Sequence, residues 1–151
     1  MKLEDAIKST KFSDMRHKAT LNLMYTAYWL KTHISDTLKE LDLTPEQYNV
    51  LRILKGKHPE QMCVKDIGTR IIEKSSNVPR IVDRLVVKKL VKRSTSKEDK
   101  RETLIALTEK GIEKLLEANK VNDKMSAEIL GITDEEAAVL NELLEKMRKT
   151  D

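Results

Sequence analysis

Apolar residues recur at steps of three and four between positions 12 and 41, a spacing that only a helix keeps on one face. The row comprises Phe12, Met15, Ala19, Leu23, Ala27, Leu30, Ile34, Leu38 and Leu41. A second apolar row, from Leu21 to Trp29, widens the stripe through the middle of this segment. The pattern predicts one long helix with more apolar surface than the core of one monomer is expected to cover.

Capping signals predict the next elements. The run from Thr44 to Gln47 has the form of a capping box with proline in the first turn, and it opens a helix to about Lys55. Residues 62–64 indicate a very short strand, followed by a helix over about 65–71. The pair Ser75-Ser76 then predicts the cap of a helix that runs to about Lys88, with a proline in its first turn, where proline is tolerated.

From Val91 the apolar period changes to two, in runs at 91–93 and 103–107 separated by a charged segment, which predicts a β-hairpin. Thr108 is the expected cap of a helix that ends near Gly131, weakened in its first turns by Gly111. A second capping box at 133–136 opens a last helix. The apolar row of this helix is Ala137, Leu140, Leu144 and Met147.

The charge of the chain is unevenly distributed. Its 151 residues are 39% apolar and 36% charged, which suits one globular domain, with or without an appended helical arm. The net charge is +4, but residues 64–101 hold 12 basic and 5 acidic residues, a net charge of +7 that leaves −3 for the remainder. The chain is therefore expected to hold one basic module.

Several classes of protein are disfavoured. The single Cys63 excludes an intrachain disulfide, the polar start is unlike a secretory signal, and no run approaches the roughly 18 apolar residues of a membrane span. We expect a soluble cytoplasmic protein in which Cys63 is a buried small residue. His17, His33 and His58 lie too far apart in sequence to suggest a shared metal ion. Without a phosphate loop or a catalytic motif, we expect neither an enzyme nor a cofactor.

The predicted order of helix, helix, helix and basic hairpin is that of a winged helix-turn-helix. In the helix from 76, one face is apolar and the other carries donors. The apolar face holds Val78, Ile81, Val82 and Leu85, and the polar face holds Asn77, Arg80, Arg84 and Lys88. Arginine bonds guanine bidentately and asparagine does so with adenine, so the polar face suits the major groove of DNA. The alternative is an ordinary solvated surface helix.

The hairpin carries a cluster of basic residues, namely Lys92, Arg93, Lys97, Lys100 and Arg101. Such a loop can follow a phosphate backbone or enter a narrow minor groove, where arginine is electrostatically favoured. The alternative is a charged edge that discourages pairing with other strands.

These segments resemble the multiple-antibiotic-resistance regulator (MarR) family of bacterial transcription factors. Residues 43–51 resemble the second helix of the family, 76–85 its recognition helix, and 99–101, Asp-Lys-Arg, its Asp-x-Arg wing signature. Residues 107–111 match the Leu-Thr-x-x-Gly that follows the wing. Two positions depart from the pattern: Lys89 stands where the family usually has glycine, and Pro79 replaces a common Ser or Thr.

The resemblance implies a mainly α fold with a small β-hairpin wing, in which the whole chain, 1–151, acts as one unit. Residues 44–108 would form the winged helix-turn-helix lobe, and residues 10–41 and 109–151 a helical dimerisation region. Two copies would intertwine their first and last helices, which would cover the wide apolar stripe.

The resemblance also implies DNA contacts from the recognition helix and the wing. Arg101 would enter the minor groove, while Asp99 would brace the wing against Arg93. The expected DNA-binding residues are Ser75, Ser76, Asn77, Arg80, Arg84, Lys88, Arg93, Lys97, Asp99, Lys100 and Arg101.

A cleft for a small aromatic or anionic effector, between the dimerisation helices and the DNA-reading lobe, is a further implication of the resemblance. Tyr25, Trp29, His33 and Tyr48 are the candidate effector-binding residues, because aromatic faces and one titratable ring suit such ligands. The alternative is that these aromatic residues belong to the core or to dimer contacts.

We therefore predict a transcriptional regulator that binds double-stranded DNA as a homodimer at a pseudo-palindromic promoter site, acts as a repressor, and is released by an effector. One alternative is a winged-helix protein-interaction module that has lost DNA binding, which the retained Arg101 and the basic module disfavour. Another is a small-molecule binding protein or enzyme built on the same helices, for which the sequence offers no reactive group.

Overall fold

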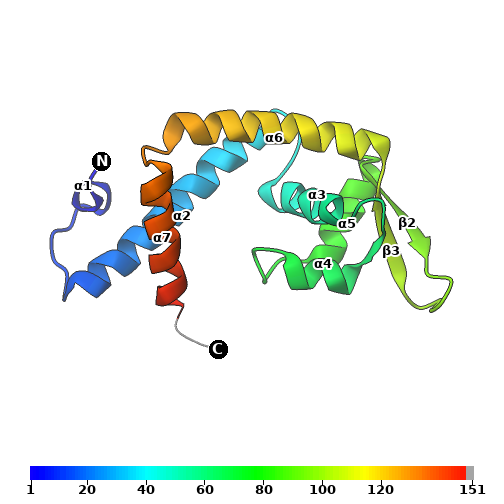
Figure 1. Ribbon diagram of the computed structural model, residues 1–151, viewed down its shortest axis with the longest axis horizontal. Helices are drawn as coiled ribbons and strands as arrows, with labels where there is room; N and C mark the ends of the chain where they lie inside the picture. Colours follow the sequence, from blue (N-terminus) through cyan, green and yellow to red (C-terminus); the bar gives the residue numbers. More distant parts are fainter. Residues whose placement is uncertain (149–151) are drawn as a thin grey trace.

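The computed structural model of the chain describes residues 1–148, which form seven helices and a three-stranded antiparallel sheet (Figure 1). In chain order they are α1 (Leu3–Ile7), α2 (Met15–Lys39), α3 (Pro45–Lys57), β1 (Met62–Cys63), α4 (Val64–Arg70), α5 (Val78–Val87), β2 (Val91–Thr95), β3 (Thr103–Leu107), α6 (Glu109–Ile129) and α7 (Asp134–Met147). The mainly helical fold with a small wing is confirmed. Residues 149–151, the end of the predicted dimerisation region, lie outside the described residues.

The predicted long helix is present as α2, but it begins later than the apolar row indicated. Asp14 is its N-cap, and the Asp14 carboxylate accepts a hydrogen bond from the backbone N–H of His17 at 2.7 Å. A cap of this kind satisfies one of the free amides of the first turn and so fixes where the helix starts. The short α1 was not predicted. It buries Leu3, and its Glu4 forms an ion pair with Lys18 of α2.

The core of the winged-helix lobe is assembled from α3, α4, α5 and the sheet. Leu51, Ile67, Val82, Leu85 and Ile105 are each fully buried in it. The strand order is β1-β3-β2, with Val91 opposite Leu107 and Met62 opposite Ile105, so the hairpin returns its apolar end to the core. The packing leaves α5 and the tip of the hairpin at one end of the molecule, away from α1 and α7 (Figure 1).

The start of α5 corrects the sequence prediction. Its N-cap is Asn77 and not the pair Ser75-Ser76, and the Asn77 side chain accepts a hydrogen bond from the backbone N–H of Arg80 at 3.1 Å. A cap acceptor bonds the amide two or three positions on. If Ser76 were the cap, the third position would be Pro79, which has no N–H to donate. With Asn77 as the cap, the third position is Arg80, whose amide is available.

The turn that ends α5 has a left-handed residue at Lys89, with φ of 60°. The amide of Leu90 bonds the Leu85 carbonyl at 3.0 Å, and the amide of Lys89 bonds the Val86 carbonyl at 2.9 Å. This pair of bonds defines a Schellman motif, which usually carries glycine at the left-handed position. The turn geometry that the glycine of the family provides is therefore retained here by a lysine, at a cost in backbone strain.

Lys89→Gly is expected to raise the free energy of unfolding by about 0.5–1 kcal/mol. The left-handed conformation costs a residue with a Cβ about 1–2 kcal/mol, and glycine avoids this cost. The gain exceeds the cost of the extra chain entropy that glycine loses on folding. Urea denaturation followed by circular dichroism measures the difference. Lys89→Ala is the control, because alanine keeps the Cβ and should bring no gain. An equal gain from alanine would show that the lysine side chain, and not the backbone, causes the strain.

The long helix α6 begins at the predicted cap, where the Thr108 hydroxyl accepts from the amide of Gly111 at 3.0 Å. Gly111 is not merely a weak point of the first turn, as expected from its low helix propensity. A Cβ built on Gly111 would lie 2.0 Å from the Leu90 carbonyl oxygen. The glycine therefore allows α6 to start directly against the turn that ends α5.

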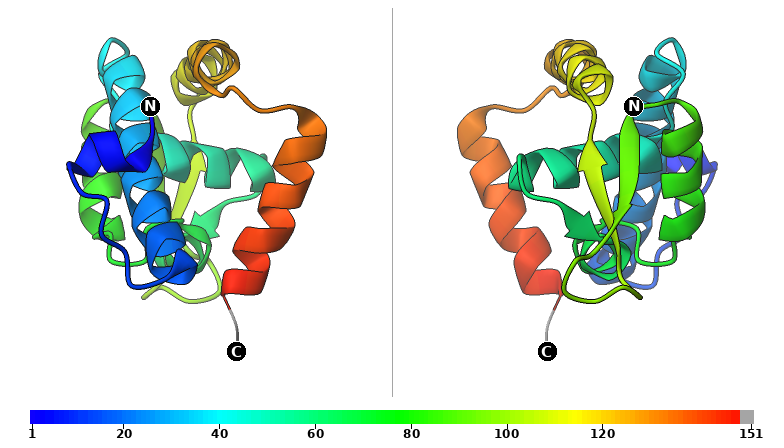
Figure 2. Two further views of the ribbon diagram at one scale, coloured as in Figure 1. Left: turned by 90° about the vertical axis from the view of Figure 1, so that its left-hand side faces the viewer. Right: turned by 90° about the vertical axis from the view of Figure 1, so that its right-hand side faces the viewer.

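The last helix, α7, lies apart from α2, on the other side of the molecule (Figure 2). Thr133 and Glu136 form the predicted capping box, with bonds of 3.2 and 2.8 Å. None of the residues of α7 is buried within one chain. The described residues contain no helix that is both long and apolar enough to cross a bilayer.

Candidate nucleic-acid interface

The helix α5 separates an inner from an outer face. Val78, Val82 and Leu85 are buried in the core of the lobe, whereas Arg80 and Arg84 are exposed on the opposite side. The two arginines are one helical turn apart in α5, and they border a shallow hollow of about 600 Å³ between α5 and the start of α3. A rigid helix with two exposed arginines is suited to donate hydrogen bonds to base edges.

Lys88 differs from these two arginines. Its ammonium donates to the Gln47 side chain at 3.0 Å and to the Asp42 carbonyl, and it lies 3.3 Å from the Asp42 carboxylate. Its side chain is only 25% exposed. The structure therefore joins the end of α5 to the turn between α2 and α3 through Lys88. This residue borders the same hollow as Arg80 and Arg84, but its ammonium is engaged in these bonds.

The wing is connected to α5 by an ion pair between Arg93 of β2 and Asp83 of α5. The expectation from the sequence that Asp99 braces Arg93 is therefore wrong, because the partner of Arg93 is Asp83. The Asp99 carboxylate instead accepts from the backbone N–H of Arg101 at 2.9 Å. Asp83 was missed because the nine residues that separate it from Arg93 give no local signal of their contact.

The tip of the wing presents its cations to solvent. Lys97, Lys100 and Arg101 are exposed, while Ser96 is 7% exposed and its hydroxyl accepts from the amides of Glu98 and Asp99 at 3.3 Å each. The serine and the Asp99 carboxylate thus shape the turn from within. The loop is therefore compact, and its charged side chains point outward.

The remaining predicted DNA-binding residues lie where α5 begins. Ser75 and Asn77 are exposed, although the Asn77 side-chain oxygen is already used as the helix cap. The hydroxyl of Ser76 is buried, and it has no hydrogen-bond partner among the described residues. All three residues border the hollow beside Arg80 and Arg84.

The four aromatic and histidine candidates for effector binding do not line one cavity. Tyr25 and Trp29 border a cavity of about 250 Å³ that Met1 and Leu3 close. The His33 ring lies against Trp29, with ring centroids 4.6 Å apart and the ring planes inclined at 52°. Tyr48 lies elsewhere: its hydroxyl donates to Asn119 of α6 at 2.7 Å, and burial raises its pKa.

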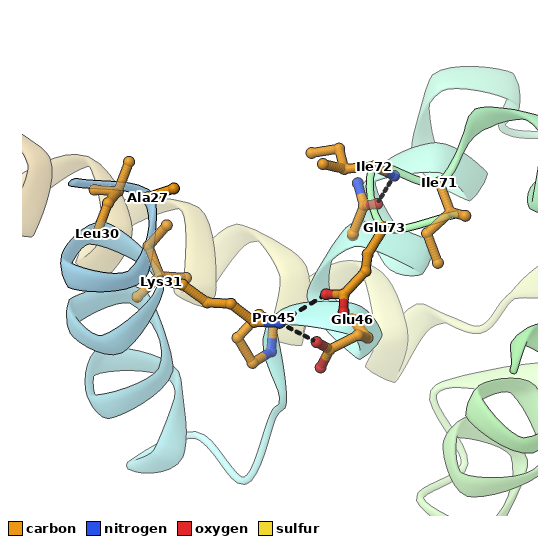
Figure 3. Close-up of a pocket in the computed structure, with 10 residues that line it drawn as sticks. Ala27, Leu30, Lys31, Pro45, Glu46, Ile71, Ile72 and Glu73 are labelled. Atoms are coloured by element: carbon orange, nitrogen blue, oxygen red, sulfur yellow. Dashed lines mark hydrogen bonds and ion pairs between the residues drawn. The ribbon is translucent and has the colours of Figure 1, made fainter. Parts of the chain in front are cut away.

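A separate cavity of about 260 Å³ lies between α2, the start of α3 and the segment before α5 (Figure 3). Its walls are mostly aliphatic, and each of the three segments contributes one charged residue. The lining residues are Ala27, Leu30, Lys31, Ile34, Pro45, Glu46, Asn49, Ile71, Ile72 and Glu73. We call this cavity the apolar cleft. Sequence reasoning missed it because its three segments are distant in the chain and each is unremarkable alone.

Lys31 joins the three segments of the apolar cleft. Its ammonium lies 2.6 Å from the Glu73 carboxylate and 3.3 Å from that of Glu46 (Figure 3). The bond to Glu73 raises the pKa of Lys31 although partial burial opposes it. Burial alone would raise the pKa of Glu46, but its own backbone N–H and Lys31 outweigh this and lower it. Both partners are therefore charged at neutral pH.

Cys63 lies outside this region, at the start of α4. It is 8% exposed, as expected for a buried small residue, and its sulfur accepts from the amide of Asp66 at 3.4 Å. That amide favours the thiolate, but burial and the neighbouring carboxylates raise the pKa of the thiol. The described residues hold no group of three His, Cys, Asp or Glu side chains that could bind a metal ion.

A helix-turn-helix with an arginine-bearing second helix, followed by a basic hairpin, defines the class of winged-helix DNA-binding proteins. The family model described as transcriptional regulator SarA/Rot matches residues 32–118 of the chain. The chain belongs to these MarR-like winged-helix transcriptional regulators, which confirms the family resemblance found in the sequence.

Individual relatives agree with this assignment. The HTH-type transcriptional regulator MhqR of Bacillus subtilis is 34% identical over 115 residues, which cover 75% of this chain and 72% of the relative. MepR of S. aureus, solved in complex with DNA, has a TM-score of 0.76 at 23% identity and covers 85% of this chain and 94% of its own. BpsR of Bordetella bronchiseptica, whose DNA binding is regulated by 6-hydroxynicotinic acid, has a TM-score of 0.74 at 23% identity, with 86% and 93% covered.

Proposed function

We propose that the protein binds a pseudo-palindromic promoter site as a homodimer and represses transcription from it. The observation that carries the proposal is the exposed pair Arg80 and Arg84 beside a wing whose tip has three exposed cations. In this arrangement α5 reads the major groove, and Arg101 reaches the adjacent minor groove. Ser75, Ser76, Asn77, Lys97, Asp99 and Lys100 adjoin these contacts. A dimer on a promoter would exclude other proteins from it.

The proposed dimer is supported by apolar surface that one chain leaves exposed. On α7, Val139, Leu140, Leu143 and Met147 are between 45% and 57% exposed, and on α2 Met24 and Tyr28 are 65% and 70% exposed. A monomer rarely leaves such rows open, so both helices are suited to pack against a second copy. The dimerisation region would thus comprise residues 10–41 and the chain from 109 onward.

We further propose that a small effector bound near α2 releases the DNA. The apolar cleft is the stronger candidate site because it touches both α2 and the segment that leads into α5. The DNA binding of the fold neighbour BpsR is regulated by a small molecule, 6-hydroxynicotinic acid. In the proposed mechanism, the dimer has two states that differ in the distance between its two winged-helix lobes, and only one of them fits the DNA. An effector can release the DNA only if it binds these two states with different affinities. A role for Tyr25 and Trp29 in effector binding stays a prediction.

Selection of sheared genomic DNA by the purified protein at about 150 mM salt tests the proposal. A pseudo-palindrome with half-sites about one helical turn apart is expected among the retained fragments. Absence of any enriched sequence would contradict sequence-specific DNA binding. A protein that binds one half-site as a monomer would contradict the dimer alone.

Salt dependence separates the proposal from a winged-helix module that binds a protein partner. Binding through several phosphates weakens with salt at a log-log slope of roughly −0.9 per neutralised phosphate. An apolar contact with a protein would show a much smaller slope.

Arg84→Ala is expected to relax the preference for one base pair of the selected site, with a cost of about 1–3 kcal/mol for the preferred base. The side chain is exposed on the outer face of α5, so the fold should not change. Selection from a library randomised at each operator position measures the preference. Lys120→Ala, at an exposed position of α6 outside the winged-helix lobe, is the control. Uniform weakening across all sequences would instead make Arg84 a phosphate contact.

A further inference from the structure

We propose that the apolar cleft selects lipophilic organic monocations. This inference rests on the proposed function only in so far as the same cleft is the effector site. It concerns the charge of the ligand, for which the family resemblance suggested anions as well as aromatic molecules. The charges that line the cleft point to the opposite sign.

The cleft has a net charge of −1. Among its ten lining residues only Lys31, Glu46 and Glu73 are charged. The single ammonium is already paired with both carboxylates, at 2.6 and 3.3 Å. One lysine cannot neutralise two carboxylates, so the residues that line the cleft keep one negative charge. Both carboxylates also border the hollow that holds Arg80, Arg84 and Lys88, but among the described residues only Lys31 forms an ion pair with them.

Binding of an anion in the apolar cleft would be electrostatically unfavourable. To bond the Lys31 ammonium it would have to displace Glu73 or Glu46, or add a third negative charge beside them. Both carboxylates belong to the chain and cannot leave. The raised pKa of Lys31 and the lowered pKa of Glu46 show that the existing pairs already favour the charged forms.

A cation would give each carboxylate a partner of its own. Lys31 can keep one carboxylate while the ligand takes the other, which brings the cleft to neutrality. Glu46 and Glu73 are 27% and 49% exposed at their side chains, so a ligand can reach them from solvent.

The walls of the cleft determine the rest of the ligand. Leu30, Ile34, Pro45, Ile71 and Ile72 present aliphatic surface. The side-chain oxygen of Asn49 is occupied, because it accepts from the Ile72 amide at 3.0 Å. A cavity of about 260 Å³ holds a group the size of a substituted benzene ring. The expected ligand is therefore a compact apolar body with one positive charge.

Three probes of similar size and different charge test the inference on the full chain by isothermal titration calorimetry. They are benzyltrimethylammonium, benzyl alcohol and benzoate. We expect the cation to bind about tenfold more tightly than benzoate, with the alcohol between them. Equal or tighter binding of benzoate would overturn the inference, and so would the absence of saturable binding of the cation up to about 10 mM.

Two substitutions locate the charge effect. Glu73→Gln keeps the shape of the side chain and should weaken cation binding to the level of the alcohol. Lys31→Met removes the competing ammonium, so it should tighten cation binding several-fold. Weaker cation binding by Lys31→Met, or a benzoate affinity that depends on Lys31, would overturn the inference. Glu98→Gln, in the wing and distant from the cleft in sequence, is the control and should change nothing.

The same samples distinguish this inference from the proposed function. If the protein enriches an operator but does not prefer the cation, only the proposed ligand class is overturned. If the protein prefers the cation but enriches no DNA, the ligand class of the cleft is supported and the proposed function is contradicted.

Discussion

Gly111→Ala is expected to lower the free energy of unfolding by about 3 kcal/mol, a large loss for a single methyl group. The new Cβ would lie 2.0 Å from the Leu90 carbonyl oxygen and 2.9 Å from the Leu90 carbonyl carbon. These backbone atoms cannot move away easily, because the same carbonyl accepts from the Thr108 amide at 3.1 Å. The Thr108 hydroxyl also donates to the Lys89 carbonyl at 2.7 Å. Relief of the clash would have to break these bonds or move the start of α6.

Urea unfolding at a fixed protein concentration measures this loss. Gly56→Ala is the matched control, since a Cβ at Gly56 meets nothing within 4 Å in the described part of the chain and the residue lies in helix α3. Alanine has a helix propensity about 1 kcal/mol better than glycine, so the control should be neutral or stabilising. If both variants were equally stable, the close approach of α6 to the turn after α5 would not limit the fold.

Arg101→Ala is expected to weaken operator binding by about 1–3 kcal/mol while the dimer stays intact. The Arg101 side chain is exposed at the tip of the wing. Among the residues that the structure describes, Arg101 is hydrogen-bonded only through its backbone N–H, to Asp99. Truncation should therefore leave the loop in place and remove only the contact with DNA. Fluorescence anisotropy with the selected operator gives the affinity, and analytical ultracentrifugation gives the state of association.

Asp99→Asn separates the side chain of Arg101 from the shape of the loop. An asparagine oxygen can still accept from the Arg101 amide, so this control should bind the operator with little change. An unchanged affinity of Arg101→Ala would remove the wing tip from the DNA contact and leave α5 alone to read the site.

The elements predicted best from the sequence are those defined by local chemistry. The caps at Thr44, Thr108 and Thr133 are present because each needs only a hydroxyl and an amide three residues on. The cap of α5 was placed one or two residues early, because the choice among neighbouring polar residues depends on the missing N–H of Pro79. A pattern search finds that a helix starts nearby and does not decide between adjacent caps.

Contacts between distant segments could not be predicted in this way. The hairpin offered Arg93 several carboxylates, and only the packing of the sheet on α5 brings Asp83 to it. Lys88 has the spacing of a DNA contact but bonds Asp42 and Gln47 in the turn between α2 and α3. The apolar cleft requires residues from three elements, of which only Pro45 and Glu46 belong to a recognisable motif.

Ion pairs at both ends of α5 couple this helix to α2, so a tilt of α2 would move α5. Lys31 joins α2 to Glu73, just before α5, and Lys88 joins the end of α5 to the turn after α2. With 25 residues at about 1.5 Å each, α2 is about 37 Å long. Pivoting α2 by about 5° at its far end would carry the attached α5 sideways by about 3 Å. This is nearly the 3.4 Å rise of one base pair. In the proposed complex with DNA, a small tilt would thus shift α5 out of register with the bases.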